Sequence, residues 1–159
     1  LKGLGALKVG VFVKQTAEEV LQIMGEAGLD LAQLHGGQGD DFCRAVGPDQ
    51  VIKVLWPERC GDPATLQAEA ERFAPVCSRL LLDAGTSGGG HGRPVDAGLI
   101  GQAIPPVPWI LAGGLDSGNA TQAVEALRPC GVDFNSGVES APGVKDEDKL
   151  RAAIQAVRG

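Results

Sequence analysis

Short apolar runs alternate with longer segments that carry helix-start signals along most of the chain. The runs are rich in Val, Ile and Leu and predict six strands, at 8–13, 29–34, 51–55, 79–82, 109–112 and 132–134. In the segments between them, apolar residues recur at helical spacing. The alternation therefore predicts a series of βα units.

The segments between the strands begin with recognisable helix signals. Thr16 and Glu19 form a capping box, in which each side chain accepts a backbone N–H at the start of the helix, and Gly28 ends the apolar series that follows. Further helices are predicted to start at Asp62, Asp96 and Ser117, with a short helix over 41–46 and a last helix through 150–157. No linker divides the series, so residues 1–159 are predicted to form a single domain.

The composition of the strands bears on the fold class. Strands that are apolar along nearly their whole length are typical of a parallel sheet that is buried on both faces. Six βα units fit either an open, doubly wound sheet or a closed barrel. Polar residues at the strand ends favour the barrel, because barrel enzymes carry their chemistry at the carboxyl ends of their strands.

Several polar residues lie in or just beyond the apolar runs. The run 80–82 ends on Asp83, Lys53 interrupts another run, and Asp133 and Asn135 lie at the end of a third. Burying a charge without a partner costs several kcal/mol, so each of these residues is predicted to have a partner or a chemical task. The period of two along a strand also places Leu81 and Asp83 on one face, and Gln33 and His35 on one face of their own strand.

Two consecutive strands run into glycine-rich loops. Gly113 and Gly114 follow one strand, and Asn135, Ser136 and Gly137 follow the next. Accessible backbone N–H groups and a helix N-terminus bind anions without a basic side chain. Because the last two units of a barrel commonly hold a phosphate group, the two loops together predict a phosphate site.

Composition and charge narrow the choice of ligand. The chain has 159 residues, with 14 basic against 20 acidic side chains, and its net charge of −6 argues against binding to nucleic acid or to an anionic membrane. Four cysteines without a CxxC pair and only two histidines give little support for a metal site or a disulfide framework. No apolar run is long enough to span a membrane, and no signal segment is visible. We therefore expect a cytoplasmic protein that takes a small phosphorylated substrate, with no metal and no organic cofactor.

The motifs, taken in chain order, resemble those of the phosphoribosylanthranilate isomerase family of tryptophan biosynthesis. The most specific are Q-L-H-G at 33–36, L-A-G-G-L at 111–115 and S-G-V-E-x-x-P-G-x-K-D at 136–146. The resemblance covers essentially the whole chain and implies a (βα)8 barrel, of which strands three to eight are present here. It also implies an Amadori rearrangement of N-(5-phosphoribosyl)anthranilate to 1-(2-carboxyphenylamino)-1-deoxyribulose 5-phosphate by general acid/base catalysis.

The resemblance further implies roles for individual residues. Asp83 stands at the place of the general acid, which protonates the furanose ring oxygen. His35 lies at the edge of the site, and the substrate phosphate lies against the loops that contain Gly113, Gly114, Asn135, Ser136 and Gly137. The resemblance allows fusion to, or association with, other tryptophan-pathway enzymes.

The chain departs from the family pattern in several places. The general base of the family is a cysteine in a K-x-C-G stretch of the first strand, and this sequence has no such stretch. We therefore expect the first two βα units, about 50 to 60 residues with an arginine-bearing loop, to be missing. Segment 88–93, a lid by its glycine content, reads G-G-G-H-G-R where the family has G-G-T-G-K at its end, and Asn135 replaces a serine.

Two other functions stay open. Another phosphate-binding barrel enzyme, such as indole-glycerol-phosphate synthase or a ribulose-phosphate epimerase, would share the glycine loops but would need a catalytic lysine or metal-binding histidines. An inactive barrel fragment would bind a sugar phosphate without turning it over. Binding measured beside turnover distinguishes the fragment from the enzyme.

Overall fold

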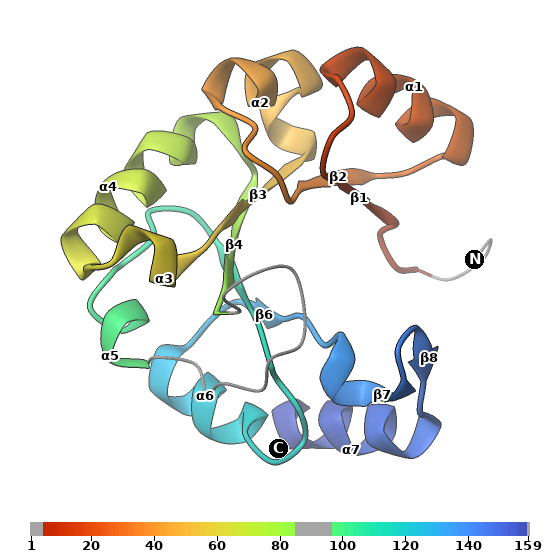
Figure 1. Ribbon diagram of the computed structural model, residues 1–159, viewed down its shortest axis with the longest axis vertical. Coiled ribbons are helices and arrows are strands. Elements are labelled where there is room, and N and C mark those ends of the chain that lie inside the picture. Colours follow the sequence, from red (N-terminus) through yellow and green to blue (C-terminus); the bar gives the residue numbers. More distant parts are fainter. Residues whose placement is uncertain (1–4, 85–96, 159) are drawn as a thin grey trace.

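A curved, six-stranded parallel sheet forms the centre of the molecule (Figure 1). The structure, a computed structural model, describes residues 5–84 and 97–158. The strands follow one another in chain order across the sheet: β1 (Val9–Phe12), β2 (Leu31–Leu34), β3 (Val51–Leu55), β4 (Arg79–Asp83), β5 (Trp109–Ala112) and β6 (Gly131–Val132). All six predicted strands are confirmed, although β6 ends two residues earlier than predicted. A short antiparallel hairpin that the apolar pattern did not predict, β7 (Glu139–Ala141) and β8 (Val144–Lys145), follows β6.

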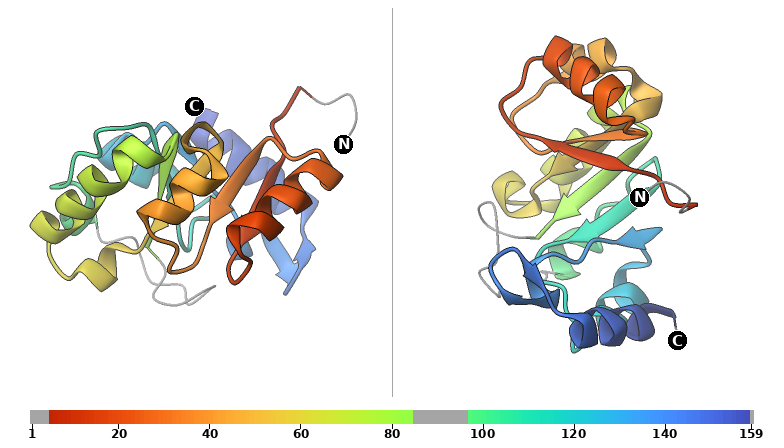
Figure 2. Two further views of the ribbon diagram at one scale, coloured as in Figure 1. Left: turned by 90° about the horizontal axis from the view of Figure 1, so that it is seen from above. Right: turned by 90° about the vertical axis from the view of Figure 1, so that its right-hand side faces the viewer.

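Helices lie along the outer side of the sheet (Figure 1). The α-helices are α1 (Ala17–Ala27), α2 (Asp40–Val46), α3 (Pro57–Cys60), α4 (Pro63–Phe73), α5 (Ala97–Ile100), α6 (Ala120–Leu127) and α7 (Glu147–Arg158). Three short 3-10 helices complete the described elements: η1 (Pro48–Gln50), η2 (Ala74–Val76) and η3 (Ser136–Val138). The elements follow an arc from α1 to α7, which lie at opposite ends of the molecule (Figure 2). The fold is therefore an α/β half-barrel. None of the described helices is long and apolar enough to cross a membrane.

Two of the predicted helix starts are confirmed in atomic detail. The Thr16 backbone N–H donates to Glu19 Oε2 at 2.7 Å, the Glu19 N–H donates to Thr16 Oγ1 at 3.2 Å, and Gly28 ends α1 in the left-handed conformation. At the start of α4, Asp62 Oδ1 accepts the Thr65 N–H at 2.9 Å.

The predicted cap at Ser117 is wrong. Helix α6 begins at Ala120, because the Asp116 carboxylate accepts the N–H groups of Gly118 and Asn119 and closes a turn before the helix. Asp96, the other predicted cap, lies outside the described residues.

Residues of the four central strands, β2 to β5, belong to two separate apolar clusters. The larger one joins the outer side of the sheet to the helices and contains Leu34, Leu80, Leu82 and Leu111. The smaller one lines the inner side and contains Leu31, Ile52, Val54, Leu81 and Ala112. The period of two expected from the sequence is confirmed: in β4, Leu81 faces the interior of the arc, and Leu80 and Leu82 face the helices.

Lys53 faces the helices and not the interior of the arc. Its side chain is 3% exposed, its Nζ donates to the Gly36 carbonyl oxygen at 3.2 Å, and it lies 5.0 Å from the centre of the Phe73 ring. Burial lowers the pKa of Lys53. The sequence predicted only that this charge has a partner. The structure supplies the Gly36 carbonyl group and the Phe73 ring, on the side of the sheet that faces the helices.

Candidate active site

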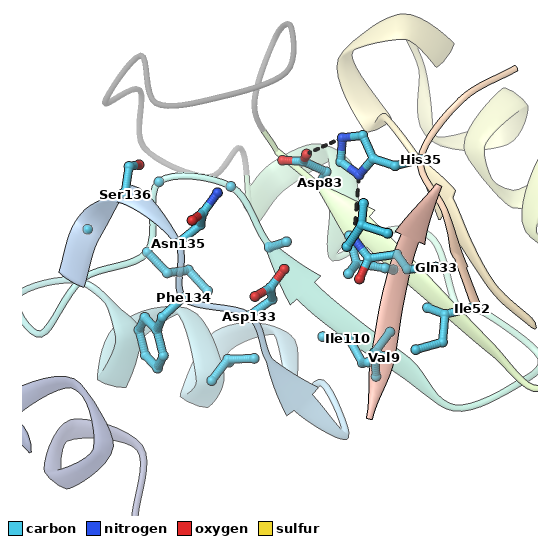
Figure 3. A pocket seen from close by; sticks show the side chains of 18 of the residues that line it. Val9, Gln33, His35, Ile52, Asp83, Ile110, Asp133, Phe134, Asn135 and Ser136 are labelled. Atoms are coloured by element: carbon cyan, nitrogen blue, oxygen red, sulfur yellow. Dashed lines mark hydrogen bonds and ion pairs between the residues drawn. The ribbon is translucent and has the colours of Figure 1, made fainter. Parts of the chain in front are cut away.

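A cavity of about 640 Å³ occupies the inner side of the sheet (Figure 3). It is lined by residues from all six parallel strands and from the loops that follow them. The structure brings all seven predicted site residues to this one cavity: His35, Asp83, Gly113, Gly114, Asn135, Ser136 and Gly137. A cavity of this volume suits a small organic substrate.

One side of the cavity carries a histidine and a carboxylate that face each other (Figure 3). His35 Nε2 lies 3.7 Å from Asp83 Oδ2, and Asp83 is only 13% exposed. The backbone N–H of His35 donates to the Phe12 carbonyl oxygen at 2.8 Å, which continues the pairing of β1 and β2 beyond their ends. Its ring meets Trp56 edge-on with the ring centres 5.3 Å apart, so both backbone and ring are held in place.

The second ring nitrogen of His35 has a partner as well. Gln33 Nε2 lies 3.5 Å from His35 Nδ1, on the same face of the chain as predicted from the period of two. If Nδ1 accepts from the Gln33 amide, the ring hydrogen lies on Nε2, which points to Asp83. This tautomer lets a neutral His35 donate to the Asp83 carboxylate.

The two glycine-rich loops also line the cavity, and the first of them follows Ala112, which pairs with Asp83 on the neighbouring strand. Gly113 and Gly114 have φ values of 96° and 64°, a backbone region that residues with a side chain rarely adopt. A methyl group at Gly137 would collide with the Leu115 carbonyl group, so the second loop packs directly on the first. Asn119 Nδ2 donates to the Gly114 carbonyl oxygen at 2.9 Å and holds the first loop.

The expected contribution of helix N-termini at these loops needs correction. Helix α6 starts only at Ala120, and the loop after Asn135 enters the three-residue η3 and not an α-helix. Any anion here would therefore meet loop N–H groups and side chains, because no long helix begins at either loop.

Asp133 and Lys145 also line the cavity, but the sequence did not mark them as site residues. Asp133 was noticed only as a polar strand end, and the common parity of Asp133 and Asn135 could have placed both on the inner side. Burial raises the pKa of Asp133, and the negative charge of Asp83 raises it further. Lys145 reaches the cavity through the β7–β8 hairpin, for which the apolar pattern carries no signal.

Other predictions fall outside this geometry. The glycine-rich segment 88–93, predicted as a lid, lies outside the described residues. Within the described ranges, no three His, Cys, Asp or Glu side chains are close enough together to hold a metal ion. None of the residues that line the cavity is a cysteine.

Comparison with known proteins decides the family. Residues 2–156 match the model of the N-(5'-phosphoribosyl)anthranilate isomerase family. This chain belongs to that family. Its members are isomerases of tryptophan biosynthesis, as the resemblance of the motifs implied.

Relatives within the isomerase family match nearly the whole chain. The isomerase of Maridesulfovibrio salexigens is 52% identical over 153 residues, which are 96% of this chain and 75% of the relative. The crystal structure of the Thermotoga maritima isomerase superposes with a TM-score of 0.81 at 29% identity, over 97% of this chain and 74% of that one. A family member in complex with reduced 1-(o-carboxyphenylamino)-1-deoxyribulose 5-phosphate superposes with a TM-score of 0.76 at 27% identity, over 97% of this chain and 72% of that one.

We predict that Asp133→Asn stabilises this isomerase at neutral pH. Because the pKa of Asp133 is raised above 3.8 in the folded protein, the folded state holds the proton more tightly than the unfolded chain does. Ionised Asp133 therefore lowers the free energy of unfolding once the pH exceeds the raised pKa. The variant should unfold at a higher urea concentration at pH 7, and this gain should shrink as the pH falls toward 3.8 and disappear below it.

The control is Asp49→Asn, which removes one negative charge at an exposed position in η1. Urea unfolding of both variants at several pH values gives the comparison. A gain for Asp133→Asn that stays constant with pH, or a loss at pH 7, would contradict the prediction.

Proposed function

We propose that the cavity carries out the isomerisation of N-(5'-phosphoribosyl)anthranilate to 1-(2-carboxyphenylamino)-1-deoxyribulose 5-phosphate. The observation that carries this proposal is the arrangement of one cavity between a histidine–carboxylate pair and two touching glycine loops. A sugar phosphate needs both: a proton donor at the sugar ring and neutral donors for the phosphate group.

Asp83 is the general acid in this proposal. It gives its proton to the furanose ring oxygen as the bond between that oxygen and C1 breaks, which leaves a protonated imine at C1. A base then removes the proton from C2, and the resulting enol amine tautomerises to the 2-ketone. Overall, one proton leaves Asp83 and one leaves C2, so the atoms and the charge balance.

His35 keeps Asp83 in position for this step. Its Nε2 lies 3.7 Å from the carboxylate, and Gln33 and Trp56 hold the ring. In this proposal the contact with Nε2 keeps the carboxyl group directed into the cavity, while His35 stays at the edge of the site.

The phosphate group is held by the loops that contain Gly113, Gly114, Asn135, Ser136 and Gly137. The positive φ angles of the two consecutive glycines leave their N–H groups without a shielding side chain. The Ser136 hydroxyl and the Asn135 amide lie at the same side of the cavity (Figure 3) and add side-chain donors.

We further propose that the half-barrel belongs to a closed (βα)8 barrel, in which the described domain supplies strands three to eight. In the described part of the chain, β1 pairs only with β2, and β6 pairs only with β5. Val9 and Val11, on the β1 edge, are 41% and 59% exposed although they line the cavity. Two further βα units between β1 and β6 would pair both edges and cover this apolar surface. They would also supply the base, since none of the described residues that line the cavity is a cysteine.

A second candidate function is sugar-phosphate binding without turnover. The absence of a cysteine among the cavity residues favours it, because the family's base would then be lacking. We place the protein in the cytoplasm, consistent with its biosynthetic family and four unpaired thiols. Fusion to, or association with, another enzyme of the pathway stays a prediction.

The barrel proposal predicts the mass of the purified native protein. We expect an intact mass several kilodaltons above the 16.3 kDa of the printed sequence, because two βα units close the barrel. A native mass of 16.3 kDa would contradict the closed barrel and favour binding without turnover.

We predict that Asp83→Asn abolishes most turnover of the native enzyme. An amide of the same shape cannot give up a proton, so kcat should fall by about a hundredfold to ten-thousandfold. The affinity for inorganic phosphate should stay within about twofold, which serves as an internal control for folding. Steady-state kinetics and calorimetric titration provide the two readouts, and unchanged kcat would remove Asp83 from the role of general acid.

We predict that Gly114→Val weakens phosphate binding by about tenfold or more. A β-branched side chain is strained at a φ of 64° and adds volume where the phosphate approaches the backbone. Gly61→Val is the matched control, because Gly61 also has a positive φ of 79° but does not line the cavity. Equal phosphate affinities of the Gly114 variant and the unchanged protein would remove this loop from the site.

A further inference from the structure

Lys145 makes three contacts at the phosphate side of the cavity. Its Nζ donates to the Asn135 carbonyl oxygen at 2.9 Å, to Asn135 Oδ1 at 2.8 Å and to Glu139 Oε1 at 2.8 Å. An ammonium group has three hydrogens, and these three acceptors use all of them. In this arrangement Lys145 has no hydrogen left for a ligand, although it lines the cavity.

The contact with Lys145 determines which way the Asn135 amide points. An ammonium group can only donate, so the oxygen of the amide must face Lys145 and the nitrogen must face away from it. The Asn135 side chain is exposed at the rim of the cavity, where it would otherwise sample several rotamers. Within the described residues, Asn135 Nδ2 has no acceptor, whereas the carbonyl oxygen and Oδ1 of Asn135 both accept from Lys145 Nζ.

The hairpin holds Lys145 in turn. Glu139 is 15% exposed, and the hydrogen bond from Lys145 lowers its pKa. Lys149 Nζ donates to the Glu139 carbonyl oxygen at 2.7 Å, and the Asp146 N–H donates to the Val138 carbonyl oxygen at 2.9 Å. The first of these bonds joins α7 to β7, and the second joins the end of the hairpin to η3, the turn that contains Ser136 and Gly137.

We propose that Lys145 is a positioning residue for the phosphate site. It holds the Asn135 amide with Oδ1 turned away, so that Nδ2 donates a hydrogen bond to a phosphate oxygen of the substrate. This inference rests on the proposed function, since it assigns a donor within the phosphate site that the glycine loops form.

The charge around Lys145 agrees with an indirect role. Its positive charge is paired with Glu139 and solvated at a side chain that is 42% exposed, which weakens its direct attraction for a phosphate, although it still lowers the pKa of Asp133 in the cavity. The phosphate then meets neutral donors, namely backbone N–H groups, the Ser136 hydroxyl and the Asn135 amide. Neutral donors lose less hydration on binding than an ammonium group does.

The test measures the Kd of inorganic phosphate and the KM and kcat of the native enzyme for its phosphorylated substrate. Lys145→Met should raise the phosphate Kd and the substrate KM by about tenfold and leave kcat within about twofold. Asn135→Ala should have the same effect. The double variant should be no weaker than Asn135→Ala alone, because Lys145 acts through Asn135.

Two further variants separate positioning from general stability. Lys145→Arg is also donor-only, so it should restore most of the phosphate affinity that Lys145→Met loses. Asn135→Asp keeps the bond to Lys145 but turns an anionic oxygen toward the phosphate, so it should weaken binding by more than tenfold without lowering Tm. Lys14→Met is the matched control, because it removes an exposed lysine that does not line the cavity, and its phosphate Kd should be unchanged.

Each outcome decides between the alternatives. An unchanged phosphate Kd for Lys145→Met, or tenfold losses that multiply to a hundredfold in the double variant, would overturn the positioning role. In the second case Lys145 would contact the phosphate directly. If the unchanged protein binds no phosphate, the proposed function fails at this site. If it binds and only Gly114→Val weakens binding, the proposed function stands and the inference about Lys145 fails.

Discussion

The alternation of side chains along the parallel strands is the constraint on which the rest of the structure depends. In β4, Leu80 and Leu82 pack against the helices, while Leu81 and Asp83 face the cavity. A shift of one residue would exchange the two faces and bury the Asp83 carboxylate in the apolar layer beneath the helices. The leucines before Asp83 therefore determine where its carboxylate lies. A run of apolar residues ends on a charge here because the inner face of the sheet opens into the cavity at that point.

Local signals predicted much of the fold, because the interactions behind them are local. The capping box at Thr16 involves residues three positions apart, and the strands are short runs with a fixed period. Ser117 was predicted as the cap, but it has polar neighbours that can accept the same N–H groups. In the structure the Asp116 carboxylate accepts the N–H groups of Gly118 and Asn119. The sequence equally could not tell that Lys53 would bind Gly36 on the outer side, because that contact joins residues of different βα units.

The site was predictable to the extent that it depends on topology. Parallel strands end at the same edge, so residues such as His35, Asp83 and Gly114 meet in one cavity although they are far apart in the chain. Asp133 lies at the same edge, but only its proximity to Asp83 distinguishes it from an ordinary strand end. Lys145 could not be found in this way, because it reaches Asn135 through a hairpin whose exposed residues carry no apolar pattern.

The distribution of charge explains how an acidic protein can hold a phosphorylated substrate. The charge of Asp83 raises the pKa of Asp133, so the cavity resists a second negative charge at Asp133. A phosphate group placed beside them would add to this repulsion. The donors of the glycine loops are neutral backbone groups whose orientation is set by packing, as the contact of Gly137 with Leu115 illustrates. In the proposed reaction, neutral donors in the loops after β5 and β6 would let a site that contains Asp83 and Asp133 still bind the anionic end of the sugar phosphate.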